Sequence, residues 1–144
     1  MNIISLLNGM AVGIFGMILS ASFCNIIWTR KKYTSMAVSM IALLLLQGVI
    51  YYFLEQGMVR YLYPLIMHIP LVIILCVFTK QRLWVVVSVV VAYFCCQLRR
   101  WLALLIMVVS VGDSRMQEVA ELAITIPLLL FLLKYISPAV RLTA

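Results

Sequence analysis

Long apolar segments separated by short polar gaps dominate this sequence. A helix needs about 20 apolar residues to cross a hydrocarbon core of about 30 Å. The pattern therefore predicts an all-α fold, a polytopic transmembrane helical bundle of about five helices that forms a single domain over residues 1–144. The expected helices follow the apolar runs 3–28, 34–54, 62–79, 83–111 and 119–136.

The fourth run differs from the others because it is long and contains Arg99 and Arg100. An arginine at the centre of a bilayer costs about 2.5–3.5 kcal/mol on insertion scales. Counted from Leu83, Arg99 lies about 24 Å up a helix that rises about 1.5 Å per residue, in the outer part of the core. We therefore expect this helix to tilt steeply or to break near residues 97–100.

The gaps between the runs differ in charge. The first gap, the third gap and the C-terminal tail contain seven basic residues and no acid: Arg30, Lys31, Lys32, Lys80, Arg82, Lys134 and Arg141. The second and fourth gaps, with their flanks, contain Arg60 and Arg115 together with all four acids of the chain: Glu55, Asp113, Glu118 and Glu121. Because basic loops stay in the cytoplasm, this alternation predicts an N-terminus outside the cell and a cytoplasmic C-terminus.

The composition supports a membrane location. Hydrophobic residues make up 67% of the chain and charged residues only 10%, which excludes an ordinary soluble domain. The net charge of +7 falls mostly in short gaps, so it indicates topology control and contact with anionic lipid, not with nucleic acid. The lipid bilayer is thus the first expected partner.

Small residues recur on the first expected helix. Gly9, Gly13, Gly16 and Ser20 follow one another at steps of three or four, so they share one face. Such residues let two helix backbones approach closely in a membrane. We favour packing within the chain over a homodimer face. Near the other end of the sequence, Pro138 is expected to end the last helix.

The candidate binding residues surround the two arginines. Arg99 or Arg100, with Gln97 nearby, could form an outward-facing polar site with one of three acids, because guanidinium pairs well with carboxylate: Glu55, Glu118 and Glu121. Such a site could receive an extracellular ligand. The favoured alternative is a structural ion pair, with the other arginine on lipid phosphate. Adjacent residues point about 100° apart on a helix, so both cannot serve one pocket unless the helix is broken.

No enzymatic motif is present. The sequence has no phosphate-binding loop, no HExxH and no GxSxG, so we expect no enzyme, cofactor or metal site. The four cysteines lie in apolar runs without zinc-ligand spacing and are interpreted as reduced packing residues: Cys24, Cys76, Cys95 and Cys96. The lone His68 is interpreted as a packing or hydrogen-bonding residue.

One segment resembles a known family. From Tyr61 to Trp101, the chain has Tyr63-Pro64, His68 before Pro70, the basic gap Lys80–Arg82, Ala92-Tyr93, Cys95-Cys96-Gln97 and Trp101. This pattern is similar to the membrane sensor region of accessory-gene-regulator-like Gram-positive histidine kinases, which carry a GHKL-type ATPase domain. The resemblance implies a homodimeric sensor in the bacterial cytoplasmic membrane that detects an extracellular signal, often a peptide, in a two-component or quorum-sensing system.

The chain departs from this family in one respect. Family members continue with further membrane helices and a kinase, whereas this sequence stops at Ala144. Kinase activity is therefore not carried over. Our leading hypothesis is a sensor domain that relays an extracellular peptide or small-molecule signal to a cytoplasmic histidine kinase module. The alternatives are a small oligomeric transporter or channel component and an assembly protein of a membrane complex.

Overall fold

The computed structural model describes residues 3–24, 26–110 and 112–142, and of residues 56, 59, 60, 63, 64 and 114 it describes the backbone alone. This described part is helical apart from short links and contains no strand, so the all-α fold is confirmed. Its elements are α1 (Ile3–Phe23), α2 (Arg30–Phe53), α3 (Gln56–Tyr63), the π-helical segment η1 (Pro64–His68), α4 (Ile69–Phe78), α5 (Arg82–Ser110), α6 (Ser114–Phe131), the π-helical segment η2 (Leu132–Ile136) and α7 (Ser137–Leu142).

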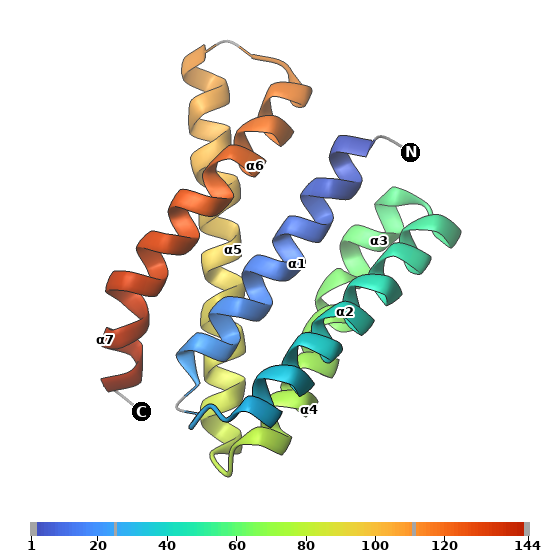
Figure 1. The fold of residues 1–144 in the computed structure, drawn as a ribbon. Helices are drawn as coiled ribbons and strands as arrows, with labels where there is room; N and C mark the ends of the chain where they lie inside the picture. Colours follow the sequence, from blue (N-terminus) through green and yellow to red (C-terminus); the bar gives the residue numbers. More distant parts are fainter. Residues whose placement is uncertain (1–2, 25, 111, 143–144) are drawn as a thin grey trace.

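The elements form five rods that run up and down (Figure 1). α3, η1 and α4 make one rod, and α6, η2 and α7 make another. The start of α1, the α2–α3 link with Glu55 and the α5–α6 link with Asp113 lie at one end of the bundle, which we call the acidic end. The α1–α2 link, the α4–α5 turn and the end of α7 lie at the opposite end, which we call the basic end.

Four helical stretches are long and apolar enough to cross a membrane, which indicates a membrane protein. They are Ile3–Phe23, Arg30–Phe53, Arg82–Ser110 and Arg115–Leu142. The remaining rod contains a shorter apolar stretch, Leu65–Phe78. Four of the five predicted spans therefore have full length, and the third is the short one.

Local hydrogen bonds move several predicted boundaries. α1 ends at Phe23, so the helix expected over 3–28 is too long. α2 and α6 begin before the apolar runs 34–54 and 119–136, because Thr29 and Asp113 cap them. Each capping side chain accepts a hydrogen bond from a backbone N–H of the first turn, at 3.4 and 3.1 Å. Such caps satisfy donors that a helix start leaves open, and a hydrophobicity pattern does not detect them.

Helix α5 is continuous from Arg82 to Ser110, so the predicted break near 97–100 is wrong. No break is needed because the two arginines lie on different faces: Arg99 is buried, whereas Arg100 is exposed. The alternative, a tilted helix, stays a prediction. Val111, the last residue of that predicted run, lies outside the described residues.

The last rod continues past Pro138, so the prediction that this proline ends the helix is also wrong. The π-helical segment η2 comes directly before, and Pro138 is the second residue of α7. A proline is tolerated in the first turn after a change of helix type, because its missing N–H would have had no regular i−4 partner there.

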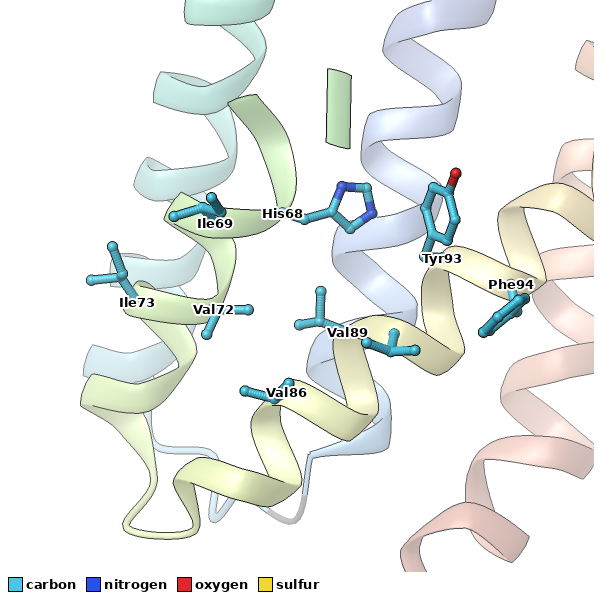
Figure 2. Close-up of a pocket in the computed structure, with 9 residues that line it drawn as sticks. His68, Ile69, Val72, Ile73, Val86, Val89, Tyr93 and Phe94 are labelled. Carbon is cyan, nitrogen blue, oxygen red and sulfur yellow. The ribbon is translucent and has the colours of Figure 1, made fainter. Parts of the chain in front are cut away.

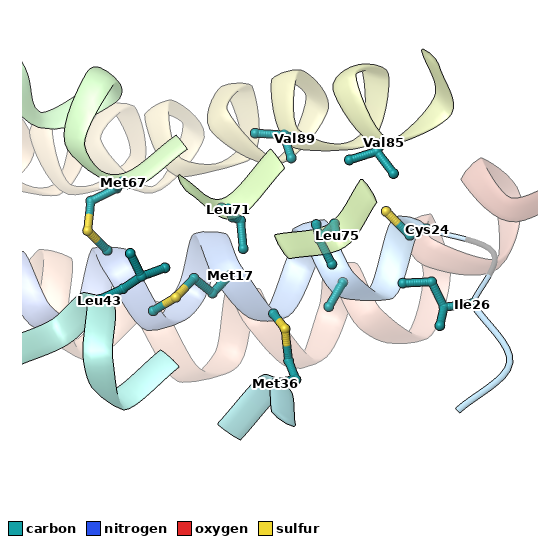
Figure 3. Close-up of a cluster of buried hydrophobic side chains, with 11 residues drawn as sticks. Met17, Cys24, Ile26, Met36, Leu43, Met67, Leu71, Leu75, Val85 and Val89 are labelled. Carbon is teal, nitrogen blue, oxygen red and sulfur yellow. The ribbon is translucent and has the colours of Figure 1, made fainter. Parts of the chain in front are cut away.

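Helix α1 lies at the centre of the bundle and buries two faces. One face packs on α2, η1, α4 and α5 in a cluster of buried side chains (Figure 3): Met17, Ala21, Cys24, Ile26, Met36, Leu43, Met67, Leu71, Leu75, Val85 and Val89. The other face packs on α5, α6 and η2 in a second cluster: Phe15, Leu19, Phe23, Ala92, Cys96, Leu128 and Leu132. Both clusters therefore depend on α1 and α5.

The small-residue stripe of α1 faces neighbours within the same chain. A side chain placed at Gly9 or Gly13 would meet Gln47 of α2, and at Gly13 its Cβ would lie 3.0 Å from the amide oxygen. Gly16 faces the sulfur of Cys96 on α5, and Ser20 donates a hydrogen bond to the Gly16 carbonyl at 2.7 Å. The absent side chains thus let α2 and α5 approach α1 closely.

Candidate functional site

A cluster of polar side chains, three of them buried and one half-buried, joins α1, α5 and α6 in the half of the bundle toward the acidic end. Its members are Asn8, Arg99, Glu121 and Thr125, which we call the Arg99 cluster. Arg99 is only 2% exposed and is the largest of the fully buried side chains. An ionised residue inside a membrane bundle marks a candidate functional site.

The phase of α5 places Arg99 inside the bundle. Ala92, Cys96, Arg99 and Ala103 are all buried and follow one another at steps of three or four residues. They form one face of the helix. Small residues one turn before and after Arg99 leave room for its long side chain.

Arg99 donates to each of the other cluster members. Its Nη1 lies 2.9 Å from Asn8 Oδ1 and 2.9 Å from Thr125 Oγ1. The same nitrogen lies 3.4 Å from the Glu121 carbonyl oxygen, and Nη2 lies 3.4 Å from Glu121 Oε2. The guanidinium thus binds one carboxylate and three neutral acceptors.

The Glu121 carboxylate is also bound by amides. Asn8 Nδ2 donates to Oε2 at 2.6 Å, and Gln117 Nε2 donates to Oε1 at 3.2 Å. Asn8 therefore bridges the two charges, donating to the acid and accepting from the base. A buried pair persists only where such additional hydrogen bonds compensate for lost hydration. The geometry is that of a structural ion pair with zero net charge.

A further contact ties α1 to α6 one turn nearer the acidic end. Ser5 donates to Glu118 at 2.7 Å, and Glu118 is half-buried. Ser5 and Asn8 are three residues apart on α1, and Glu118 and Glu121 are three apart on α6. The two helices therefore meet along matching polar faces.

The structure unites some of the predicted site residues and separates others. Arg99 and Glu121 pair, and Glu118 lies beside them. Arg100 is exposed, and Glu55 is exposed in the α2–α3 link, so neither joins the Arg99 cluster. Gln97 is half-buried on α5, and within the described residues it does not join the cluster either.

Sequence reasoning missed four residues around the cluster: Ser5, Asn8, Gln117 and Thr125. Two signals could have identified them. Asn8 is an amide inside an apolar run, and such residues form hydrogen bonds between membrane helices. Gln117, Glu121 and Thr125 follow one another at steps of four, so they share a face of α6.

At the basic end, the C-terminal rod contacts α1 again. Arg141 Nε donates to the Ser22 carbonyl at 2.6 Å, and Ser137 Oγ donates to the same carbonyl at 3.2 Å. The hydroxyls of Ser22 and Ser137 are also hydrogen-bonded to each other. These donors satisfy a carbonyl that the end of α1 leaves open, as basic side chains often do. The α6–η2–α7 rod is therefore attached to α1 at both ends.

Neither metal-ligand geometry nor a disulfide is found in the part of the chain that the structure describes. No group of three or more histidine, cysteine or acidic residues there could hold a metal ion, and the four cysteines are free. His68 is half-buried and stacks edge to face on Tyr93, with ring centroids 5.2 Å apart. Comparisons with protein-family models, curated proteins and solved structures found no match.

Proposed function

We propose that this chain is a membrane-embedded sensor domain in a bacterial cytoplasmic membrane, with five crossings, an outer N-terminus and a cytoplasmic C-terminus. A peptide or small ligand acts at the acidic end, outside the cell. The α6–η2–α7 rod carries the resulting shift to a cytoplasmic histidine kinase module. The resemblance of residues 61–101 to kinase sensor regions supports the signalling class.

The observation that carries this proposal is the double attachment of one rod to the central helix. At the acidic end, α6 is held to α1 by directional contacts of Glu118 and Glu121. At the basic end, Ser137 and Arg141 hold α7 to the last turn of α1. A change at the first attachment can therefore reach the second through one helical rod, provided that the ligand favours one of two packings.

The distribution of charge supports the proposed orientation. Seven basic residues and no acid belong to the segments at the basic end, whereas the four acids belong to the acidic end. Basic segments face the cytoplasm in most membrane proteins. The short third rod is the proposed fifth crossing: its apolar stretch Leu65–Phe78 is shorter than the about 20 residues of a typical span, so the start of α3 would lie at the level of the outer headgroups.

The cluster itself suggests how a ligand would act. Arg99 is buried and already hydrogen-bonded, so an incoming ligand first meets the half-buried Glu118 and the exposed Arg115 above it. A ligand that draws Glu118 from Ser5 would loosen the contact that lies next to Asn8 and Glu121. The proposed signal is thus an opening of the α1–α6 contact, with the Arg99 cluster as the element that resists it.

The relay can be tested without knowing the ligand. Spin labels on noncanonical amino acids at Ile27 and Ala139, both exposed at the basic end, report the distance between α7 and the α1–α2 link in lipid nanodiscs. We expect Arg99→Leu to shift this distance or add a second one, and the exposed control Arg100→Leu to leave it unchanged. An unchanged distance in Arg99→Leu would overturn the relay.

The other functional classes are separated by two further measurements. Substrate flux in proteoliposomes would favour a transporter or channel component, since a sensor should show none. Co-purification with a stable membrane complex, with neither flux nor a shifted distance, would favour an assembly protein.

A further inference from the structure

A groove runs along the outer surface of the bundle between α4 and α5 (Figure 2). Its volume is about 380 Å³, within the range of about 300–1,000 Å³ that is typical of ligand sites. Aliphatic side chains from both helices form its walls: Ile69, Val72, Ile73, Val86, Val89 and Val90. Val89 is buried at the floor, whereas Ile73 and Val90 are exposed at the rim.

Two rings close the groove at the end away from the α4–α5 turn. His68, the last residue of η1, and Tyr93 of α5 reach toward each other, with ring centroids 5.2 Å apart (Figure 2). The aliphatic walls and the closed end suit a hydrocarbon chain that enters from the turn or from the side. The groove alone does not say which molecule carries that chain.

The α4–α5 turn supplies the second observation, which is charge. Lys80 and Arg82 are exposed there. The start of α2 adjoins this turn, because Lys32 Nζ donates to the Phe78 carbonyl at 3.3 Å, and it adds the exposed Arg30 and Lys31. The four acids of the chain belong to segments at the other end. Four cations thus lie beside the mouth of an apolar groove, and the described part of the chain places no aspartate or glutamate at this end.

The lengths fit a lipid that spans one leaflet. The groove-lining part of α5 begins at Val86 and ends at Phe94, which is roughly 6 to 18 Å from Arg82 at about 1.5 Å per residue. One leaflet of hydrocarbon is about 15 Å deep, half of a core of about 30 Å. A phosphate at the turn therefore places an acyl chain along the groove.

We propose that the α4–α5 hairpin binds one anionic phospholipid, with its phosphate on Lys80 and Arg82 and one acyl chain in the groove as far as His68 and Tyr93. Arg30 and Lys31 add attraction from the start of α2. The site needs both parts: the cations select a negative headgroup, and the groove selects a lipid over a soluble phosphate. This lipid site does not depend on the proposed sensor function.

The test compares phosphatidylglycerol with phosphatidylcholine of identical acyl chains, binding to detergent-purified protein and counted by native mass spectrometry. We expect one phosphatidylglycerol to be retained about tenfold more strongly, because basic residues near a surface attract anionic lipids. A diazirine on its acyl chain should crosslink to residues 69–73 and 86–94. Glycerol phosphate should not compete, which separates a lipid site from a free phosphate site.

Three variants complete the experiment. K80Q/R82Q should abolish the preference, and V90W should block the crosslinks while the headgroup preference falls less. K134Q, which removes an exposed cation from a different rod, should change neither. Circular dichroism and size-exclusion profiles confirm that each variant is folded. A preference that survives K80Q/R82Q, or crosslinks spread equally over all rods, would overturn the proposal.

Discussion

The two sides of α1 are packed on different chemical principles. Toward α5 and α6, the contact combines an apolar cluster with the buried Arg99 and Glu121 and the half-buried Asn8, which are held by hydrogen bonds of defined direction. Toward α2 and α4, it consists of aliphatic and methionine side chains around the amide of Gln47, which donates to the Gly9 carbonyl at 2.9 Å.

This difference matters because lipid is as apolar as the side chains that it would replace. In a membrane the hydrophobic effect does not drive helices together, so close packing and hydrogen bonds must hold them. The apolar side can adjust in small steps when a helix slides, whereas the polar side has few alternative partners. We therefore expect the polar side to behave as the two-state contact and the apolar side as the deformable one.

The largest effect should come from Arg99→Leu, which leaves the Glu121 carboxylate buried without its cation. Removing one partner of a buried pair destabilises proteins by about 3–5 kcal/mol. Unfolding in mixed micelles measures this loss. The double variant R99L/E121L should recover most of the stability, because no buried charge remains. Failure of that recovery would show that the amide bridges, not the charges, dominate the contact.

On the apolar side, Leu75→Ala should cost less. Leu75 is fully buried between α1 and α5, and such truncations cost about 2–5 kcal/mol in soluble cores. We expect the low end of that range, since only packing contacts are lost while the transfer term is small in lipid. The same unfolding assay measures it. A loss larger than that of Arg99→Leu would contradict the ranking of the two sides.

Next in size, Gly13→Val should destabilise by about 1–3 kcal/mol, the usual cost of overpacking. Its Cβ would lie 3.0 Å from Gln47 Oε1 and 3.2 Å from Met67 Cε. The matched control is Gly48→Val, because nothing lies within 4 Å of a Cβ built there. Equal losses in the two variants would mean that helix propensity, not close packing, explains the effect.

The smallest effect expected is that of Asn8→Ala, about 1–2 kcal/mol, since hydrogen bonds between membrane helices are individually weak. This substitution removes the amide that bridges Arg99 and Glu121, while both charges stay in place. In the distance measurement at residues 27 and 139, we expect a smaller shift than for Arg99→Leu. No shift, with stability reduced as expected, would limit Asn8 to a structural role.

Much of this protein follows from its sequence. The apolar runs determine the helices and the membrane class, because about 20 apolar residues can bury their backbone in lipid only as a helix. The gaps determine how charge is divided between the two ends. Positions of small residues on α1 indicate where neighbours can approach, and the structure places Gly9, Gly13 and Gly16 against α2 and α5.

Other features were decided by tertiary contacts. The sequence shows that Arg99 and Arg100 point apart, but which of them is buried depends on where α1 and α6 lie. The partner of Arg99 is Glu121 and not Glu55 because α6 packs on α5, whereas the α2–α3 link is part of another face of the bundle. The predicted break in α5 is absent for the same reason. A guanidinium that finds Asn8, Thr125 and Glu121 inside the bundle has no need of water, so the helix can remain whole.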